Sequence, residues 1–498
     1  MNATEKQESA LKTEICESER LHLSGKIQGY GILIQVDMGS GVITHVSDNI
    51  RDLDGLTPEA LCGQPLSCLP WLEREIPPQL PGRVGPFRQI HRLVTTKTTA
   101  YDAVLIENGS ALLLELEPTP QQQEMIQIWE YERDLHQLPT VAEELPHYHN
   151  DTLSSIQSII GFDRVMVYRF HSDWSGEVIA EVCNPEHGSY LGLHFPASDI
   201  PAIARNLYQI NSCRLIADTR AEAVAIHGEN GTPPDLTYSD LRSVSEMHLA
   251  YLDNMGVRAS FSVPIIVNQR LWGLISCHHL QPRYLNRNQR AVCASLIKTY
   301  SLALSTYYTS YRVKQMDSLE RRIDTVLEAI SLYSNPLEGV EQQSNLLLES
   351  LGADGIAMAY HDDVVIVGEA PDLQEMSEID DWFLNRQESS LVTIDNLSSE
   401  FELSQTLLAR TSGLLAIRAR SPRSGWVRIY WFRQEEIQEV PWAGNPNKPF
   451  AEDASATTLS PRRSFEKWIE IRRGYSRPWS HEDRLTAGRF RNTLLRWL

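Results

Sequence analysis

The sequence predicts an α+β protein with three sequential domains, antiparallel sheets with flanking helices, and a long connecting helix. At 498 residues, the chain has room for three domains of about 150 residues each. Short apolar runs punctuated by glycine and proline recur in three separate blocks, as expected of strands and turns. A long helical pattern begins at Asn286 and separates the second block from the third. We therefore expect an N-terminal segment followed by three domains, at 1–27, 28–124, 125–305 and 306–498.

The composition excludes several classes of protein. The formal net charge of −20 would repel a phosphate backbone, and no basic stripe interleaved with aromatic residues offsets it, so nucleic acid is not an expected partner. No apolar run approaches the ~18 residues that a membrane span needs. The first fifteen residues do not form a secretory signal. The seven cysteines lack Cys-x-x-Cys spacing, which argues against a disulfide framework and a zinc site. We expect a cytoplasmic protein without a membrane segment or a bound metal.

The first block is predicted to form a small antiparallel sheet. Strand-like runs alternate with glycine and proline turns at 31–36, 41–46 and 111–116. Two prolines and three glutamines at 118–123 mark the end of this domain. The block contains no catalytic constellation.

The second block combines a helix with longer strands. The spacing predicts a helix and then two strands, at 145–160, 162–170 and 176–182. Alternation along the first strand puts Met166, Tyr168 and Phe170 on one apolar, aromatic face. Residues 220–237 are rich in glycine and proline, which indicates an irregular excursion.

A further strand at 271–279 closes the second block and carries Cys277, His278 and His279. Strand alternation sends His278 to the face opposite the other two, which leaves at most two converging ligands. We therefore predict no metal site here.

The most distinctive stretch surrounds Asp199, which lies between Pro196 and Pro201. Proline removes a backbone donor and biases the residue before it toward an extended conformation, so Asp199 is expected on a stiff, non-helical turn. Apolar residues at helical spacing then predict a short amphipathic helix with Pro201 in its first turn. Asp199 is either a helix cap, the commoner role, or a fixed anion that faces a ligand.

A second dense stretch covers residues 241–262. His248 and Tyr251 fall at helical spacing, and Gly256 is a natural helix stop. Fork-shaped and hydroxyl donors suited to carboxylates come from Arg242, Ser245, Ser260 and Ser262. Taken one at a time, these residues fit a solvated helix face equally well.

The long helical pattern has two interpretations. Apolar residues recur at spacings of four and three, which approximates a coiled-coil seam, at Leu296, Tyr300, Ala303, Tyr307, Leu319, Ile323, Val326 and Ile330. Such a seam would join two chains in a homodimer. Burial against the chain's own domains explains the same spacing equally well.

The third block is predicted to be an α+β domain. Strand-like runs occur at 353–360, 363–368, 413–418 and 425–433. An excursion rich in glycine and proline follows and leads to the segment Ser460-Pro-Arg-Arg-Ser-Phe465. No kinase, ATP-binding or cyclase motif follows, so we expect no output activity in this chain.

These motifs resemble those of phytochromes, the red/far-red photoreceptors that hold a linear tetrapyrrole in a GAF domain. The stretch from Tyr190 to Asp218 resembles their chromophore-pocket signature, and Cys16 with its flanking residues resembles the N-terminal segment of bacteriophytochromes. The three blocks follow the order PAS, GAF, PHY, and Ser460–Phe465 resembles the Pro-Arg-x-Ser-Phe motif of the PHY hairpin called the tongue. The resemblance implies a light receptor and not an enzyme. Its partners would be a second copy of the chain and a histidine kinase or other output domain, with a response regulator downstream.

The resemblance also implies a cofactor and its contacts. Cys16 would form a thioether to biliverdin, because Met247 stands where relatives that bind other bilins carry a cysteine. The implied cofactor contacts are Tyr168, Phe195, Asp199, Ile200, Tyr208, Arg214, Arg242, Ser245, His248, Tyr251, Ser260, Ser262 and His278. In the tongue, expected at about 425–470, Arg462 and Ser464 would relay the signal. A loop of the GAF domain would encircle the N-terminal segment in a figure-of-eight knot.

Two other functions compete with light reception. A GAF domain can serve as a light-independent sensor of a cyclic nucleotide or another small ligand. An enzyme would use Asp199, His248 and Tyr251 as acid and base groups, but the sequence offers no nucleophile with its base. An absorption spectrum after mixing with biliverdin separates these possibilities.

Overall fold

The computed structural model describes residues 19–53, 55–69, 71, 88–95, 100–119, 126–228, 231–333, 335–361, 363–386, 390–400, 410–421, 425–445 and 465–497. The chain divides into two compact units. Unit 1 comprises Met1–Tyr307 with Pro441–Trp468, and unit 2 comprises Tyr308–Val440 with Ile469–Leu498.

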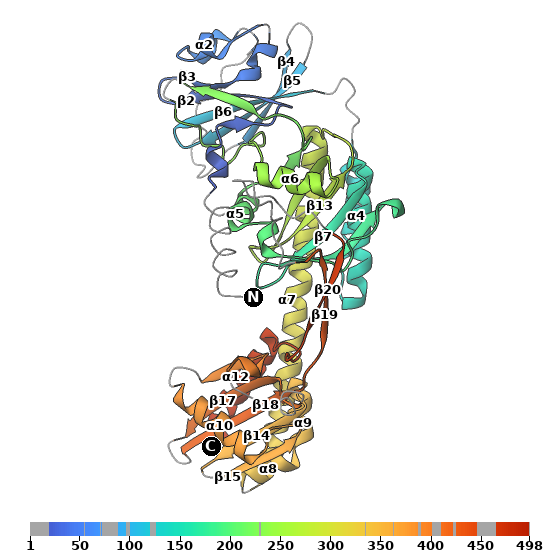
Figure 1. Cartoon of the computed structure of the whole chain (residues 1–498), viewed down its shortest axis with the longest axis vertical. Coiled ribbons are helices and arrows are strands. Elements are labelled where there is room, and N and C mark those ends of the chain that lie inside the picture. Colours follow the sequence, from blue (N-terminus) through green and yellow to red (C-terminus); the bar gives the residue numbers. More distant parts are fainter. Residues whose placement is uncertain are drawn as a thin grey trace, which may run out of the picture. The chain divides into compact units, whose positions relative to one another are not determined.

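The first sheet of unit 1 is antiparallel and has seven strands, in the order β1-β11-β3-β2-β6-β5-β4 (Figure 1). The strands are β1 (Lys26–Ile27), β2 (Ile32–Asp37), β3 (Ile43–Ser47), β4 (Arg88–Thr95), β5 (Ala100–Asn108), β6 (Ala111–Pro118) and β11 (Val224–Gly228). Ile34, Leu105 and Leu114 contribute to its apolar core, together with Leu61 of the short helix α2 (Pro58–Leu61). The three predicted strands correspond to β2, β3 and β6, whereas the sequence did not predict β4 and β5.

The second sheet of unit 1 has the strand order β10-β12-β13-β7-β8-β9-β19-β20. Its strands are β7 (Arg164–Phe170), β8 (Gly176–Cys183), β9 (His194–Phe195), β10 (Arg214–Ile216), β12 (Ala259–Val267), β13 (Arg270–His279), β19 (Gln438–Ala443) and β20 (Lys467–Arg472). The surrounding helices are α3 (Ile128–Leu135), α4 (Leu145–Ile160), α5 (Ala202–Ile210), α6 (Glu246–Asn254) and the start of α7 (Arg287–Ser331). Helix α4 has the predicted bounds, and it ends at Gly161 because this residue adopts the left-handed φ of 64° that glycine tolerates.

The N-terminal segment lies between two parts of the loop that follows β10. On one side β1 pairs with β11, and on the other side the amide of Gln28 donates to the carbonyl of Leu241 at 2.8 Å. Strand β11 also pairs with β3, so part of the stretch expected to be irregular completes the first sheet. The knot depends on the path of the chain before Glu19, which lies outside the described residues, and it stays a prediction.

A buried carboxylate connects the first sheet of unit 1 to the start of α7. Glu117 of β6 is fully buried and accepts hydrogen bonds from Arg290 and, at 2.9 Å, from the hydroxyl of Tyr284. Arg287 adds a second guanidinium group 3.3 Å from the same carboxylate. Removing one partner of such a buried pair typically costs about 3–5 kcal/mol, so these residues stabilise unit 1 as one body.

Unit 2 is built on a five-stranded sheet with the order β15-β14-β18-β17-β16. Its strands are β14 (Gly355–Tyr360), β15 (Asp363–Gly368), β16 (Leu391–Ile394), β17 (Gly413–Ser421) and β18 (Gly425–Arg433), and its helices are α8 (Pro336–Gln342), α9 (Ser344–Leu351), α10 (Leu373–Asn385) and α12 (His481–Trp497). Side chains on the two faces alternate into two separate cores, with Trp431 in one and Tyr430 in the other. The predicted strands of this domain are all present.

The hairpin expected at about 425–470 begins later than predicted. Strand β18 pairs with β14 on one side and β17 on the other, and its residues from Val427 onward are buried. A strand that is paired on both edges and buried on both faces is part of a domain core. The segment that belongs to unit 1 instead starts at Pro441.

Helix α7 buries most of the predicted seam against the chain itself. Leu296, Tyr300, Ala303 and Tyr307 are at most 5% exposed within unit 1. In unit 2 the core includes Ile323, Val326 and Ile330, while the side chain of Leu319 is outside the described set. Of the two interpretations, burial against the chain's own domains therefore applies to these positions, and a dimer would use other residues.

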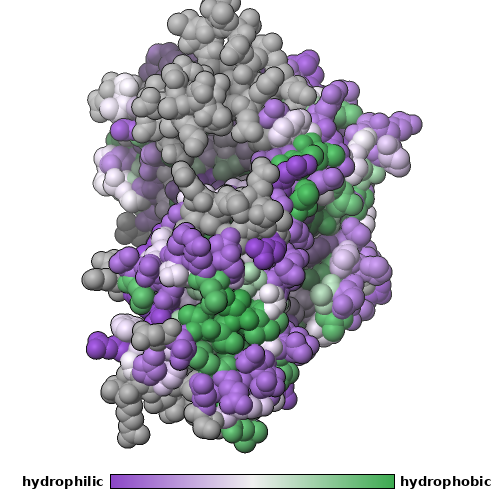
Figure 2. Space-filling view, turned by 60° about the horizontal axis from the view of Figure 1, so that its bottom comes forward, coloured by the Kyte–Doolittle hydropathy of each residue, from purple (hydrophilic) through white to green (hydrophobic). Residues whose placement is uncertain are grey.

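The surface that is drawn in Figure 2 is mostly hydrophilic, and hydrophobic side chains gather in one larger area of it. Among the described helices, none is long and apolar enough to cross a membrane. An apolar area on a hydrophilic surface is typical of sites of protein contact.

Candidate ligand-binding site

Unit 1 contains a cavity of about 310 Å³, formed by one face of the second sheet together with α5 and α6. All thirteen residues implied by the pocket motifs line it: Tyr168, Phe195, Asp199, Ile200, Tyr208, Arg214, Arg242, Ser245, His248, Tyr251, Ser260, Ser262 and His278. Residues that are far apart in the sequence thus converge on one space. Their contacts with a cofactor remain a prediction.

One wall of the cavity is apolar and aromatic. The predicted alternation along β7 holds, because Met166 and Tyr168 both point into the cluster that lines the cavity. The ring of Tyr168 lies 5.9 Å from that of Phe195 and directly over Gly176 of β8, where an added Cβ would lie 1.9 Å from the tyrosine Cζ. Gly176 therefore provides the space in which this ring sits.

The Asp199 turn faces the cavity and does not cap a helix. Residues Ala197–Asp199 form one turn of 3₁₀ helix, where the sequence predicted a non-helical turn. Helix α5 begins after Pro201, which occupies the N-cap position, and no side chain caps it. The Oδ2 atom of Asp199 instead accepts a hydrogen bond of 2.8 Å from the hydroxyl of Tyr251, on α6. This contact supports the second of the two roles expected for Asp199, a fixed anion at a ligand site.

Two histidines keep neutral rings in the cavity. Burial, with a smaller contribution from Arg214, lowers the pKa of His248 to about 4. Burial also lowers the pKa of His278 to about 3, assisted by the charge of Arg164. A neutral imidazole has one donor and one acceptor nitrogen, so at pH 7 each ring can accept a hydrogen bond from an N–H group of a ligand.

The arginines of the pocket also bind the surrounding backbone. Arg214 donates to the carbonyls of Asp240, Arg242 and Ser243, at 3.2 Å and 3.0 Å for the first and last of these. The guanidinium group of Arg242 donates through Nη1 to the carbonyl of Thr237 at 3.1 Å. Burial and the charge of Arg214 lower the pKa of Arg242 to about 9, so it remains charged at pH 7. These groups stabilise the loop after β11 and place positive charge beside the cavity.

Hydroxyl groups complete the polar side of the cavity. The hydroxyl of Tyr208 lies 2.7 Å from the Oγ of Ser262, and Ser260 is buried two residues earlier on the same strand. Alternation along β12 puts both serines on one face.

The described part of the N-terminal segment reaches the cavity. Glu19 and Leu21 line it, and the Oγ of Ser243 donates to that of Ser24 at 2.9 Å. Cys16 lies outside the described residues, three positions before Glu19. Its attachment role stays a prediction.

The predicted signal motif also has a described residue at the site. Arg462 and Ser464 are outside the described residues, but the ring of Phe465 packs edge-on against Tyr251, with centroids 5.1 Å apart at 87°. Tyr251 thus contacts both Phe465 and Asp199. The contact places the end of the motif next to the cavity within unit 1.

Several residues that line the cavity were not predicted to do so. Ser276 is two residues before His278 on β13, and its Oγ lies 3.4 Å from the histidine Nε2, so strand alternation could have indicated it. Tyr190 also lines the cavity, and the centre of its ring lies 3.9 Å from the guanidinium carbon of Arg164. Asn211 and Cys213 follow α5 within the stretch that resembles the pocket signature, and only their place in that stretch could have indicated them.

Three family models match the chain: the PAS fold over residues 16–119, the GAF domain over 150–304 and the phytochrome region over 319–498. The bacteriophytochrome of Xanthomonas campestris pv. campestris is 33% identical, in a match that covers 94% of this chain and 76% of that protein. The chain belongs to the phytochrome family. The cyanobacterial phytochrome B of a Nostoc species is 34% identical over 94% of this chain, which spans 64% of that relative's length.

The fold is also that of solved phytochromes. The photosensory core module of the Stigmatella aurantiaca phytochrome superposes with a TM-score of 0.80 at 30% identity, and the match covers 97% of each chain. The three-domain order expected from the sequence is therefore confirmed. Phytochromes are red/far-red light receptors with a linear tetrapyrrole chromophore, and nothing in these relatives favours a cyclic-nucleotide sensor. None of the three matching family models is that of a catalytic domain.

Proposed function

We propose that this chain is the photosensory part of a red/far-red light receptor that carries biliverdin on Cys16. One observation carries the proposal: the thirteen residues implied by the pocket motifs line the same cavity that Glu19 and Leu21 reach from the N-terminal segment. A cavity that binds a free small ligand has no need of an N-terminal segment whose cysteine is only three residues before Glu19 in the sequence. The alternative, a light-independent ligand sensor, leaves that juxtaposition unexplained.

The chemistry of the cavity suits a linear tetrapyrrole. Neutral His248 can accept from pyrrole N–H groups, and neutral His278 can donate toward the carbonyl of the last pyrrole ring. Asp199 supplies a carboxylate for a protonated ring system. The arginines and serines provide donors for propionate groups, and the apolar wall packs against conjugated rings. When bound, biliverdin would supply a light-driven isomerisation about a double bond, and the protein orients the pigment and shapes the outcome.

Cys16 is the residue to which the cofactor would be attached. Its thiolate sulfur would bond to a carbon of a vinyl side chain, while a proton from solvent joins the neighbouring carbon, so no redox partner is needed. The other position at which relatives carry a bilin-binding cysteine is occupied by Met247, whose thioether cannot form this bond.

The signal would leave the cavity through Asp199 and the tongue. Asp199 and Arg462 would form a charge-assisted pair in one photostate, and the packing of Phe465 on Tyr251 supports a tongue that lies beside the aspartate. Light would change what Asp199 can bond to and release the pair. A homodimer and a separate output domain, such as a histidine kinase acting on a response regulator, would carry the signal onward.

The experiment mixes the purified chain with biliverdin and records absorption spectra after red and after far-red light. We expect two spectra that interconvert with light, and bilin fluorescence with zinc on a denaturing gel. Cys16→Ser should lose the gel fluorescence, whereas Cys68→Ser, which removes an exposed thiol, should keep it. Covalent pigment on Cys16→Ser would refute the attachment site. A spectrum that does not respond to light would refute the receptor and favour the small-ligand sensor.

A further inference from the structure

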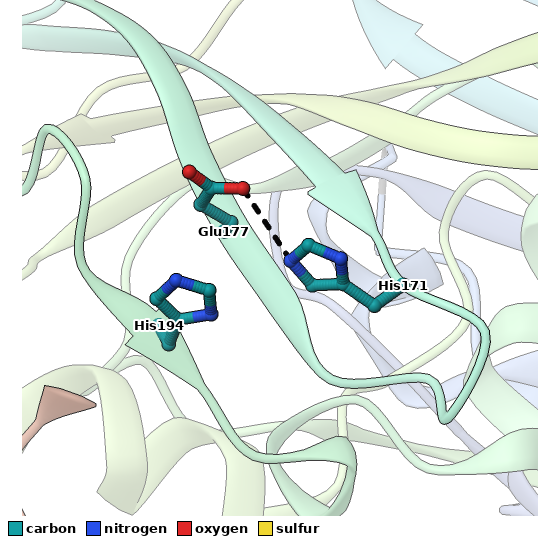
Figure 3. Close-up of side chains that lie close together, drawn as sticks. All are labelled: His171, Glu177 and His194. Carbon is teal, nitrogen blue, oxygen red and sulfur yellow. Dashed lines mark ion pairs between the residues drawn. The ribbon is translucent and has the colours of Figure 1, made fainter. Parts of the chain in front are cut away.

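A cluster of three metal-ligating side chains lies on the second sheet of unit 1, away from the cavity. One ring nitrogen each from His171 and His194 and one carboxylate oxygen of Glu177 all lie within 4.8 Å of one another (Figure 3). None of the three residues lines the cavity described above. The sequence analysis did not single them out, because they lie far apart and match no short motif.

The register of the sheet explains why these residues meet. Strand pairing places Glu177 of β8 directly opposite His194 of β9. On its other side Glu177 faces Arg169 of β7, and His171 follows two residues later, on the same face by alternation. The neighbours of these residues along the strands, such as Phe195, point to the opposite face and line the cavity. Glu177 and the two histidines therefore share the face opposite the pocket.

The geometry leaves room for an ion between the side chains. The Nε2 atom of His171 lies 3.4 Å from Oε2 of Glu177, which is its partner in this cluster. The two imidazole rings stack, with centroids 5.3 Å apart and planes at 11° (Figure 3). The side chains of His171 and Glu177 are 32% and 23% exposed, so solvent ions can reach them.

A purely electrostatic role is the simpler interpretation of Glu177. Arg169 donates to its Oε2 at 2.7 Å, and this ion pair alone would hold the carboxylate. A carboxylate has two oxygens, however, and a partner on one of them orients the other, as outer-shell partners do at metal sites. The pair also does not explain why two histidines converge on the same group.

We propose that His171, Glu177 and His194 bind a divalent transition cation of the Zn²⁺ class, independently of the tetrapyrrole. Two imidazoles and one carboxylate form a three-ligand set that Zn²⁺ accepts, with water in the remaining position. In such a site ligand atoms lie about 3.4 Å apart, as follows from bonds of about 2.0–2.1 Å. The three candidate ligand atoms lie within 4.8 Å of one another. Small rotations of these partly exposed side chains would therefore bring the atoms to the spacing of a zinc site.

A bound ion would affect the contact between β9 and β19, because His194 takes part in it. His194 pairs with Trp442 in the parallel contact of β9 with β19, and the two rings lie 5.7 Å apart. An ion would join β8 to β9 at the place where β19, at the start of the Pro441–Trp468 segment of unit 1, pairs with β9. Phe195, the next residue, belongs to the wall of the cavity. The site thus borders both the pigment pocket and the segment that contains the tongue.

The test measures Zn²⁺ binding to the whole chain without bilin, because a tetrapyrrole itself coordinates zinc. The chain is stripped with a chelator and titrated with Zn²⁺ against a zinc-binding dye, and Co²⁺ replaces zinc to give an absorption band that reports the ligand geometry. Three variants remove one ligand each while keeping size and polarity: His171→Gln, Glu177→Gln and His194→Gln. His147→Ala removes an exposed histidine of α4 and is the matched control.

We expect the wild-type chain and His147→Ala to bind one more Zn²⁺ per chain than each of the three variants, or to bind it at least about tenfold more tightly. A circular dichroism spectrum and a thermal melt that match the wild type establish that each variant is folded. Equal zinc binding by wild type and all three variants would overturn the proposal, as would its loss in His147→Ala. Because these readouts need no light response, they are independent of the proposed receptor function.

Discussion

Tyr251→Phe tests whether the signal passes between the cavity and the tongue. The hydroxyl of Tyr251 donates to Asp199 at 2.8 Å, while its ring stacks on His248 with centroids 6.0 Å apart and contacts the edge of Phe465 at 5.1 Å. Phenylalanine keeps both ring contacts and removes only the hydrogen bond. The variant therefore tests the hydrogen bond between Tyr251 and Asp199 apart from the packing of Tyr251 on Phe465.

The size of the effect follows from the type of bond that is lost. A hydrogen bond to a charged group contributes about 1.5–3 kcal/mol net. Since 1.4 kcal/mol corresponds to a factor of ten, a bond made in only one photostate biases the equilibrium between the states by about 10- to 150-fold. The state with the Tyr251 contact should lose population by this factor in Tyr251→Phe.

The assay is the spectrum of the biliverdin-loaded chain at dark equilibrium, together with the rate of dark reversion after each colour of light. We expect the reversion rate to change by about tenfold or more, and Arg462→Ala to act in the same direction. Tyr208→Phe is the matched control, because it removes a hydroxyl from the same cavity whose partner, Ser262, is neutral. A neutral pair contributes about 1 kcal/mol, so the control should change the rate by about fivefold at most.

Reversion kinetics and dark spectra in Tyr251→Phe that match the wild type, with normal pigment attachment, would refute this reasoning. A double-mutant cycle with Phe465→Leu adds a sharper criterion. Coupled residues deviate from additivity by about 0.5–3 kcal/mol. Strict additivity would mean that the contact between the two rings transmits nothing.

Three further predictions concern the pocket, the fold and the assembly. Gly176→Ala should displace the ring of Tyr168, and overpacking of about 1–3 kcal/mol should weaken biliverdin binding about 5- to 150-fold in a titration. Burial lowers the pKa of His149 to about 4, whereas the ordinary value in the unfolded chain is about 6.5. Between these pH values unfolding takes up a proton, so the free energy of unfolding should rise by about 3 kcal/mol from pH 4 to 6.5. His149→Gln should flatten this rise in denaturant melts. Sedimentation at micromolar concentration should show a dimer. Leu302→Glu, on the exposed face of α7, should weaken this dimer, whereas Leu373→Glu should leave it unchanged. A monomeric wild-type chain would contradict the prediction.

The sequence carried enough information for the local elements and for most of the pocket. The alternation of Met166, Tyr168 and Phe170 determines which face of β7 is apolar, and this period survives in the structure because the sheet buries that face. Asp199 was identified as a candidate site residue because Pro196 and Pro201 restrict the backbone on either side of it, and such prolines can be read directly from the sequence. The pocket residues could be assembled only through their resemblance to a known family, because their spacing alone does not bring them together.

The elements that the sequence missed depend on distant partners. Strand β11 is short, and it becomes a strand only because β1 and β3 offer free edges far away in the sequence. The tongue was expected to start at about residue 425, which is the first residue of β18. The sequence pattern of β18 fits both an arm of a hairpin and a strand in a domain core, so it could not distinguish the two. The cluster of His171, Glu177 and His194 depends on strand register, which no local pattern specifies.

The pairing of β11 with β3 also constrains how the chain folds during its synthesis. Residues 43–47 leave the ribosome long before residues 224–228, so the first sheet waits with an open edge until most of the second domain has been made. Closing so long a loop is slow, although each doubling of its length adds only about 0.6 kcal/mol of entropic cost. Until β11 arrives, β3 can pair with an edge of another nascent chain. A fragment that ends at residue 124 keeps this edge permanently, and we expect it to aggregate where the longer chain does not.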